Sequence, residues 1–335
     1  MKIKKSWKII LGLLIALILF GYLFFIANYY PVKRDLKHRP DFFGVTFSKK
    51  FCDLLGIDWR ETYQAMLDEL KVKYIRIPVY WDEIEKNEGT FDFTDNDYLL
   101  DIGEQQGAKF VVVVGRRSPR WPECHAPEWI NEKSSADVQA ATLEMIKTVV
   151  ERYKNRGSIE YWQIENEAFL GTFGVCPPLD QEFLKKEFAL VRSLDNRQII
   201  ITGSGELGFW KKEAKIGDIF GSTLYRVVYD RRLGYLKYPL PTAYYRLKGW
   251  LVGLTPERLM IMELQAEPWA PKGVITDLTR AEIDKTMSIE QFKKNLQYTI
   301  NLNFSRNYIW GVEWWYWEKK YGNPEYWQIA ETLFK

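Results

Sequence analysis

The stretch I-E-Y-W-Q-I-E-N-E, residues 159–167, decides the predicted fold of this chain. It begins as a short apolar run, typical of a buried parallel strand, and it ends on Asn166 and Glu167. A second run, R-L-M-I-M-E at 258–263, has the same character and ends on Glu263. About three further strand–helix units fit between the two acids. The spacing therefore predicts that they close strands four and seven of a (β/α)8 barrel.

Strands and amphipathic helices alternate through the rest of the chain, which favours an α/β protein with a parallel sheet. We expect helices at Asp58–Leu70, from Ser134 or Ser135 to about Asn155, at Asp180–Leu194 and from Ser288 to about Ser305. Residues 226–257 interrupt this rhythm, and they are interpreted as helix six with an elaborated loop that could wall a cleft or touch a membrane surface. The predicted strands are residues 42–47, 72–78, 109–115, 159–167, 198–203, 218–223, 259–263 and 308–317.

The N-terminus has the pattern of a membrane segment. Lysines at positions 2, 4, 5 and 8 precede the uncharged apolar stretch Ile9–Ala27, which is about long enough to cross a bilayer as a helix. Cleavage after Ala27 would put Phe25 at the −3 position, so an uncleaved signal anchor is favoured over a signal peptide. The lysines should stay in the cytoplasm and the remaining chain outside it. We therefore predict an anchor at 1–28, a tether at 29–40 and a (β/α)8 TIM barrel at 41–335.

Charge and cysteine usage exclude several classes of function. A net charge of +3 is too small for a nucleic-acid-binding protein. The chain has 2 histidines, His38 and His125, which argues against a histidine-based zinc site or a Ser-His triad, and neither a metal nor an organic cofactor is implied. We expect His125 to be a hydrogen-bonded loop residue. Cys124 and Cys176 fall in neighbouring loops after strands three and four, so they can form a disulfide; the alternative is three free thiols.

The paired glutamates indicate a chemistry. Two carboxyl groups flanking a scissile glycosidic bond can serve as proton donor and nucleophile, and a separation of about 5 Å favours retention whereas about 6.5–9.5 Å favours inversion. Glu267, in the segment L-Q-A-E-P-W at 264–269, is an alternative nucleophile. Glu165 shares the strand face of Glu167, but it should lie deeper in the barrel.

With these residues in place, the chain resembles the clan A (β/α)8 glycoside hydrolases, a group that includes cellulases, β-mannanases, β-xylosidases and β-galactosidases. The resemblance covers roughly residues 41–335, and the Asn-Glu pair after strand four is its most specific element. It implies that Glu167 is the acid/base, that Asn166 binds the sugar 2-hydroxyl and that Glu263 is the nucleophile. It also implies that Arg76 and Tyr225 lie beside the nucleophile, as a cation and a hydrogen-bond donor.

Aromatic residues after the predicted strands are candidate sugar platforms, because the C–H faces of β-linked pyranoses pack flat on aromatic rings. The loop after strand three, residues 116–129, is rich in Arg, Trp and Pro, and it is expected to line a subsite. By the resemblance, one Trp of the run W-W-Y-W at 314–317 floors the sugar site. The candidates are Trp81, Trp121, Trp269, Trp314, Trp315 and Trp317.

We therefore expect a membrane-anchored, extracytoplasmic, retaining β-glycosidase that acts on an oligo- or polysaccharide. Two alternatives remain open from the sequence. One is a catalytically inactive barrel that binds glycans at the cell surface. The other is a transglycosylase that uses the same residues as a hydrolase. Neither the sugar nor the linkage can be predicted from the loops.

Overall fold

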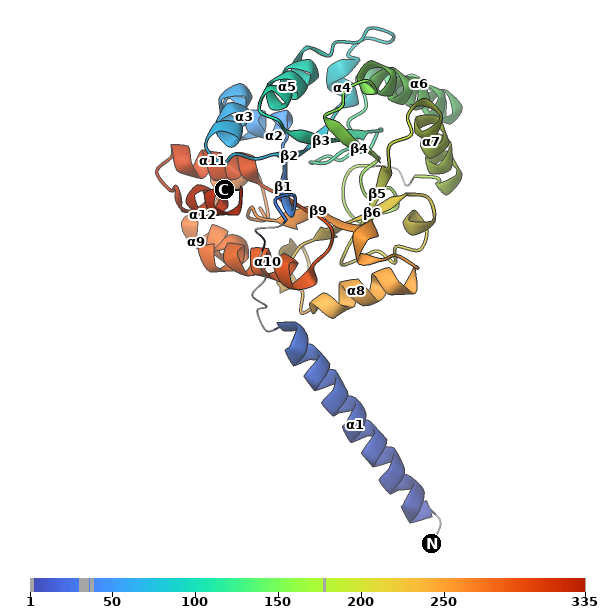
Figure 1. Cartoon of the computed structure of the whole chain (residues 1–335), viewed down its shortest axis with the longest axis vertical. Coiled ribbons are helices and arrows are strands. Elements are labelled where there is room, and N and C mark those ends of the chain that lie inside the picture. Colours follow the sequence, from blue (N-terminus) through green and yellow to red (C-terminus); the bar gives the residue numbers. More distant parts are fainter. Residues whose placement is uncertain (1–2, 30–35, 37–38, 177–178, 335) are drawn as a thin grey trace.

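The computed structural model describes residues 3–29, 36, 39–176 and 179–334. Within them, parallel strands close into a barrel in the order β1-β10-β9-β6-β5-β4-β3-β2, surrounded by helices (Figure 1). The predicted (β/α)8 barrel is confirmed. Its strands are β1 Phe43–Thr46, β2 Tyr74–Pro78, β3 Lys109–Val114, β4 Ile159–Ile164, β5 Ile199–Gly203, β6 Ile219–Leu224, β9 Leu259–Gln265 and β10 Asn307–Trp310.

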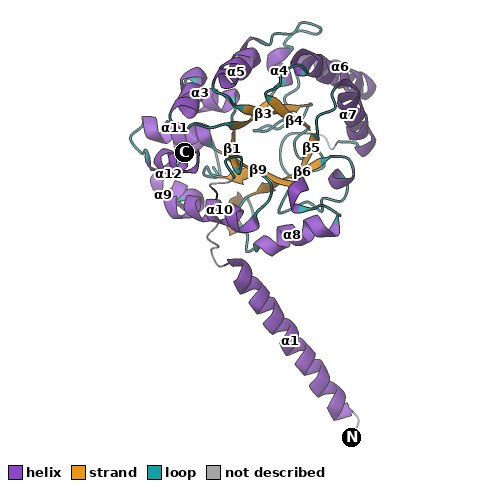
Figure 2. Cartoon of the chain, viewed as in Figure 1, coloured by secondary structure: helices purple, strands orange, loops and turns teal. Residues whose placement is uncertain are grey.

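Helices form the outer ring, as Figure 2 shows. Side chains of Asp58, Ser134, Asp180 and Ser288 cap α3, α6, α7 and α10, as expected, by accepting hydrogen bonds from backbone amides in the first turn. The helices around the barrel are α2 Lys49–Leu55, α3 Trp59–Asp68, α4 Trp81–Ile84, α5 Thr94–Gln105, α6 Ser135–Tyr153, α7 Gln181–Leu194, α8 Thr242–Leu251, α9 Arg280–Met287, α10 Ile289–Leu302, α11 Val312–Lys320 and α12 Glu325–Phe334.

Two buried layers hold this architecture together. The larger lies between the strands and the helices, and it includes the β3 residues Val112 and Val114. The smaller consists of side chains inside the barrel, among them Val111, Ile200 and Met260. Because successive strand residues point to opposite faces, the apolar run of β3 supplies both layers. Apolar side chains thus fill the interior of the barrel. At the carboxyl ends of the strands, polar side chains replace them.

Three predicted element boundaries are wrong. Strand four ends at Ile164, so Glu165–Glu167 belong to the following turn. Strand eight ends at Trp310, and the W-W-Y-W run lies in α11 instead, because Gly311, with φ of 122°, turns the chain into that helix. Residues 226–257 contain more than a helix. The antiparallel hairpin of β7 Val227–Asp230 and β8 Gly234–Lys237 precedes α8.

The N-terminal segment forms α1, Ile3–Tyr29, which extends away from the barrel in Figure 1. Among the described residues, no helix combines the length and the apolar character required to span a bilayer. The predicted transmembrane helix is therefore not supported. Of the predicted tether, residues 30–35 and 37–38 lie outside the described part of the chain.

Candidate active site

The turn after β4 places Asn166 and Glu167 at the carboxyl end of the barrel. Glu165 and Glu167 have φ values of 56° and 46°, in the left-handed region that side-chain-bearing residues seldom adopt. Backbone hydrogen bonds hold this conformation: Asn166 N donates to Arg117 O (2.8 Å), and Glu167 N donates to the Thr202 hydroxyl (2.9 Å). Strain of this kind persists only where the surroundings fix it, and it concentrates at functional sites.

Glu263, inside β9, is surrounded by Arg76 and Tyr225, which were predicted to lie beside it, and by Asn166, which was predicted to bind the sugar. Arg76 Nη1 lies 3.4 Å from Glu263 Oε1, and Asn166 Nδ2 donates to the same oxygen at 3.1 Å. The Tyr225 hydroxyl, directly after β6, donates to Oε2 at 3.1 Å. Both oxygens therefore carry donors, and a cation lies beside one of them. This arrangement fixes the direction of the carboxyl group and places positive charge beside it.

Arg76 is fully buried on β2, and its partners fix its direction. Its Nε donates to Gln163 Oε1 (2.8 Å), its Nη1 to Met262 O (3.0 Å) and its Nη2 to Asn166 Oδ1 (2.7 Å). These bonds join strands β2, β4 and β9 through one guanidinium. Because the same guanidinium orients the Asn166 amide toward Glu263, the site is pre-organised.

Glu167 is also buried, but in a different environment. The Thr223 hydroxyl lies 3.4 Å from its Oε1, and no ion pair to Glu167 occurs among the described residues. Burial, followed by the negative charges of Glu263, Glu123 and Glu206, raises the pKa of Glu167 well above its ordinary value. A carboxyl group held neutral in this way can donate a proton near neutral pH.

Two acids of this site, Glu123 and Glu206, were not singled out from the sequence. Burial and the charge of Glu263 raise the pKa of Glu123 to about 8. Burial raises the pKa of Glu206 to about 7, although hydrogen bonds from the Tyr245 hydroxyl and from Tyr225 N counteract it. Glu206 directly follows the turn after β5, and Glu123 lies in the loop expected to line a subsite. The position of each acid after a predicted strand was thus the feature of the sequence that could have indicated them as site residues.

The two other acids considered as alternatives have different partners. Glu267 forms an ion pair with Arg120, and its Oε1 also accepts a hydrogen bond from the Trp310 indole (2.8 Å). Glu165 accepts hydrogen bonds from the backbone amides of Arg116 (2.8 Å) and Arg117 (2.6 Å). Neither acid contacts the Arg76–Asn166 pair that holds Glu263.

Aromatic rings border the mouth of the barrel. Trp121, which is 63% exposed, contacts Phe173, Phe173 contacts Trp269, and Trp269 contacts Tyr225, with 5.7 Å between centroids in each pair. These rings come from the segments after β3, β4, β9 and β6. Trp121, Trp269 and Tyr225 were predicted substrate-binding residues, whereas Phe173 was not.

Four other predicted platforms lie elsewhere. Trp81, Trp314 and Trp315 are fully buried in helices and offer no exposed face, so those predictions are wrong. Trp317 packs on Tyr321 along α11. The tryptophan at the end of the eighth barrel strand is Trp310, which the sequence analysis missed because it extended that strand to residue 317. Its ring stacks over Arg120 at 4.0 Å.

The loops after β3 and β4 are joined covalently. Cys124 and Cys176 form a disulfide with a Cα–Cα distance of 5.4 Å, which was one of the two alternatives that the sequence left open, and Cys52 is a buried free thiol. His125, as expected, is a hydrogen-bonded loop residue, with Nε2 3.0 Å from Arg120 O. Burial and the nearby Lys50 charge lower its pKa to about 4. A neutral imidazole thus helps to hold the loop.

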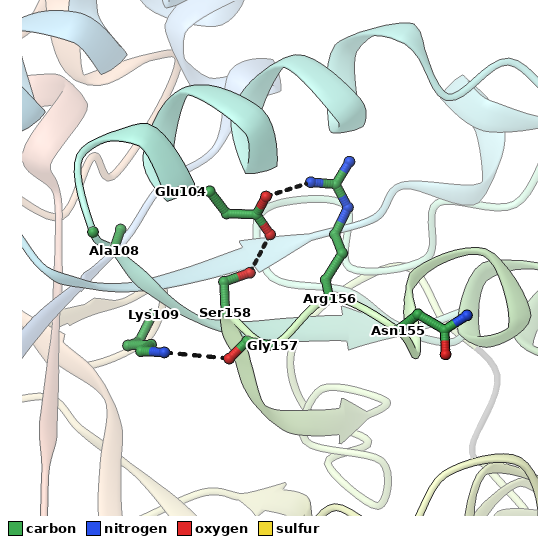
Figure 3. Close-up of a pocket in the computed structure, with 8 residues that line it drawn as sticks. Glu104, Ala108, Lys109, Asn155, Arg156, Gly157 and Ser158 are labelled. Carbon is green, nitrogen blue, oxygen red and sulfur yellow. Dashed lines mark hydrogen bonds and ion pairs between the residues drawn. The ribbon is translucent and has the colours of Figure 1, made fainter.

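The opposite end of the barrel carries a separate depression of about 410 Å³, shown in Figure 3. Its polar groups pair with one another: Arg156 Nη1 lies 2.9 Å from Glu104 Oε2, and Lys109 Nζ donates to Gly157 O (3.2 Å). The described residues contain no cluster of three or more His, Cys, Asp or Glu side chains suited to a metal ion. The titratable groups suited to chemistry therefore gather at the carboxyl end.

Comparison with known proteins now adds an independent finding. The model of glycosyl hydrolase family 10 matches residues 77–176, which include Asn166 and Glu167. The resemblance to clan A glycoside hydrolases is confirmed. The same match, together with the relatives below, supports the prediction of a glycoside hydrolase enzyme.

The curated relatives are matched over only part of their length. The chain is 29% identical over 121 residues to endo-1,4-β-xylanase 3 of Hypocrea jecorina, covering 34% of this chain and 33% of the xylanase. It is 22% identical over 182 residues to a β-galactosidase of Clostridium cellulovorans, covering 46% of this chain and 26% of that protein. The chain thus spans about a third or less of these relatives.

Solved structures share the fold. Xylanase 10B from Thermotoga maritima superposes with a TM-score of 0.58 at 16% identity, covering 90% of this chain and 97% of that one. A GH5_18 protein from Bifidobacterium longum subsp. infantis gives 0.58 at 12% identity, covering 80% and 68%. At these identities the likeness concerns the barrel architecture.

Proposed function

We propose that this protein is a retaining β-glycosidase that works by double displacement with Glu263 and Glu167. The observation that carries the proposal is the contrast between the two acids. Glu263 has a guanidinium at 3.4 Å and accepts hydrogen bonds at both oxygens, whereas Glu167 is buried among other acids. Pairs of carboxyl groups whose environments differ in this way divide into nucleophile and proton donor.

The reaction follows from these environments. A Glu263 oxygen attacks the anomeric carbon while the Glu167 carboxyl protonates the departing oxygen, so the glycosidic bond breaks and a glycosyl ester forms. Glu167, now ionised, removes a proton from water, and the water oxygen attacks the same carbon and releases Glu263. Arg76 and Tyr225 orient the nucleophile through their contacts with its two oxygens. No cofactor takes part in this scheme.

A β-linked oligo- or polysaccharide is the proposed substrate. The aromatic rings of Trp121, Phe173, Trp269 and Tyr225 suit the apolar faces of sugars. The names of the relatives, a xylanase and a β-galactosidase, are consistent with this class of substrate.

The test is hydrolysis of aryl β-glycosides and β-glycans by the full chain, with Glu263→Ala, Glu167→Ala and Glu267→Ala compared with the wild type. We expect Glu263→Ala to lose about a thousandfold or more in kcat on all substrates. Glu167→Ala should lose most with poor leaving groups, because good ones leave without protonation. Glu267→Ala should keep the double-displacement chemistry.

Each other outcome has a clear meaning. Loss confined to Glu267→Ala would transfer the nucleophile to Glu267. Release of product with inverted anomeric configuration would exclude double displacement. Glycosyl transfer to a second sugar in preference to water would favour a transglycosylase, and glycan binding without turnover by folded wild type would favour a binding barrel.

An extracytoplasmic, membrane-attached location is part of the same proposal. The Cys124–Cys176 disulfide supports an oxidising compartment. Large apolar side chains of α1, such as Ile9, Leu17 and Phe20, are exposed, and they follow a lysine-rich start. Membrane fractionation of the full chain, before and after alkaline carbonate washing, tests the attachment. Release of the protein by the wash would argue against a spanning anchor.

A further inference from the structure

Glu123 is a buried acid at the reaction centre that the double-displacement scheme leaves without a role. Its residue is 4% exposed, and its φ of 75° lies in the left-handed region. Gly174, in the loop after β4, lies directly against its stem. A Cβ at Gly174 would come within 2.8 Å of the Cβ and Cγ of Glu123. The strained backbone and the adjoining glycine indicate a side chain held in one direction.

Held in this direction, the carboxyl group of Glu123 lies near the nucleophile Glu263. Asn166 Nδ2 donates to Glu123 Oε2 (3.1 Å) and to Glu263 Oε1 (3.1 Å), so one amide joins the two carboxyl groups. The other oxygen of Glu123 accepts no hydrogen bond from any residue that the structure describes. It is therefore available to a bound molecule.

The chemistry of a pyranose decides which sugar atom meets Glu123. The anomeric carbon is flanked by the ring oxygen, which only accepts hydrogen bonds, and by C2, whose substituent can donate. An ionised carboxylate also only accepts, so Glu123 in its ionised form would have no donor to offer the ring oxygen. Tyr225 lies on the other oxygen of Glu263, and its hydroxyl suits the ring-oxygen side. The C2 substituent thus belongs beside Asn166 and Glu123.

Charge distinguishes a hydroxyl from an ammonium as the substituent on C2 of the sugar. The nearby guanidinium of Arg76 pairs with Glu263, and Arg120 pairs with Glu267 and Glu313. Within the described part of the chain, Glu123 has no ion pair; the negative charge of Glu263 lies near it, and so do the positive charges of Arg117 and Arg76. A hydroxyl on C2 would bring one donor and no charge, whereas an ammonium brings a positive charge and several donors.

Building on the proposed function, we propose that Glu123 is a specificity-determining residue that binds the ammonium on C2 of a 2-amino-2-deoxy sugar, the sugar whose anomeric carbon reacts. The free amine is essential to this proposal. An acetylated nitrogen is uncharged, so it would bring no cation to Glu123. Burial and Glu263 raise the pKa of Glu123 to about 8, although Asn166, Arg117 and Arg76 counteract them, and an ammonium bound beside the carboxyl group would favour its ionised form.

The experiment compares aryl β-glucosaminide with aryl β-glucoside as substrates of the full chain. We expect wild-type kcat/KM to favour the glucosaminide by about tenfold or more, and Glu123→Gln to reduce this preference by about ten- to a hundredfold. Glu128→Gln is the matched control, because Glu128 lies in the same loop region but is exposed. It should leave the preference unchanged.

Several results would overturn the inference. A wild type that hydrolyses the glucoside but shows no preference for the amine would refute it while leaving the proposed function intact. Equal losses on both substrates in Glu123→Gln would reduce Glu123 to a structural role. Hydrolysis of neither substrate by a folded wild type that cleaves another β-glycoside would overturn this inference alone, whereas cleavage of no β-glycoside or β-glycan by folded wild type would overturn the proposed function as well.

A second measurement covers the case in which Glu123→Gln does not fold. Glucosamine should inhibit the wild type competitively about tenfold more strongly than glucose does. Equal inhibition constants for the two sugars would contradict a C2 ammonium site.

Discussion

At the scale of single residues, Thr223 shows how the site couples its acids. Its hydroxyl lies 3.4 Å from Glu167 Oε1 and 3.3 Å from Glu206 Oε2, and it accepts a hydrogen bond from Gly205 N (3.0 Å). Since one hydroxyl has one proton, it can donate to only one of the two acids at a time. The protonation of Glu167 therefore depends on the charge of Glu206.

The pH profile tests this dependence. Glu167 must be protonated to act as an acid, so kcat/KM should fall as pH rises through its raised pKa, which is above the usual range for glutamate. Glu206→Gln removes a negative neighbour, and this lowers the pKa of Glu167. The basic limb should move to lower pH by up to about one unit.

Glu128→Gln serves again as the control, since it removes an exposed charge, and its profile should match the wild type. A basic limb that stays in place in Glu206→Gln would show that another group governs it.

At the scale of elements, a buried acid pair joins α7 to the turn that follows β4. Glu187 of α7 is fully buried, and neither of its oxygens accepts a hydrogen bond from a donor among the described residues. Burial, followed by the adjacent carboxyl of Glu165, raises the pKa of Glu187 well above its ordinary value. A proton held between the two carboxyl groups would satisfy this arrangement.

This pair makes stability fall as pH rises. Glu187 binds its proton more tightly when folded, so unfolding releases a proton in the window between its ordinary pKa and its raised folded value. Across that window the wild type should lose up to about 1.4 kcal/mol of stability per pH unit from this group. In Glu187→Gln that loss should disappear, because the amide does not titrate and can still donate to Glu165.

Melting temperatures of both proteins from pH 5 to 8 measure the effect. The gap between Glu187→Gln and the wild type should grow in favour of the variant as pH rises. Glu182→Gln, an exposed change on the same helix, should give a constant gap. A constant gap for Glu187→Gln would contradict the shared proton.

At the scale of the whole molecule, the two ends of the barrel have separate tasks. Arg306 lies just before β10, at the amino-terminal end, and it donates to Glu160 Oε2 (2.5 Å) and Asp41 O (3.0 Å). It also stacks over the Tyr74 ring at 4.1 Å. These contacts join segments that are far apart in sequence, whereas the candidate catalytic residues lie at the other end. In such barrels, the amino-terminal face serves stability.

Arg306→Ala should therefore destabilise the protein without changing its chemistry. Arg306 is buried but its acidic partners are about a third exposed, so the loss of these charge-assisted hydrogen bonds should cost about 1.5–3 kcal/mol. We expect denaturant unfolding to show this loss, whereas kcat/KM per folded molecule changes by less than about twofold. Arg306→Lys, which retains the charge but not the fork of donors, should be intermediate. A large drop in kcat/KM with unchanged stability would show that the two ends are coupled.

The sequence by itself determined the barrel and part of the site. The strand–helix alternation and the caps at Asp58, Ser134, Asp180 and Ser288 depend on neighbours within one turn or strand, so periodicity reveals them. Asn166 and Glu263 were found because acids and amides at the carboxyl ends of parallel strands must converge. The resemblance to known glycoside hydrolases then supplied Arg76 and Tyr225.

Only the tertiary structure decided which acids and rings meet. Glu123 reaches Asn166 because the loops after β3 and β4 are joined by a disulfide, and Glu206 reaches Thr223 from the end of β5. The choice of Trp310 over the W-W-Y-W run depended on where Gly311 ends the strand. Such contacts connect distant segments, and their distances are set by barrel closure and loop packing. Local sequence patterns carry no record of either.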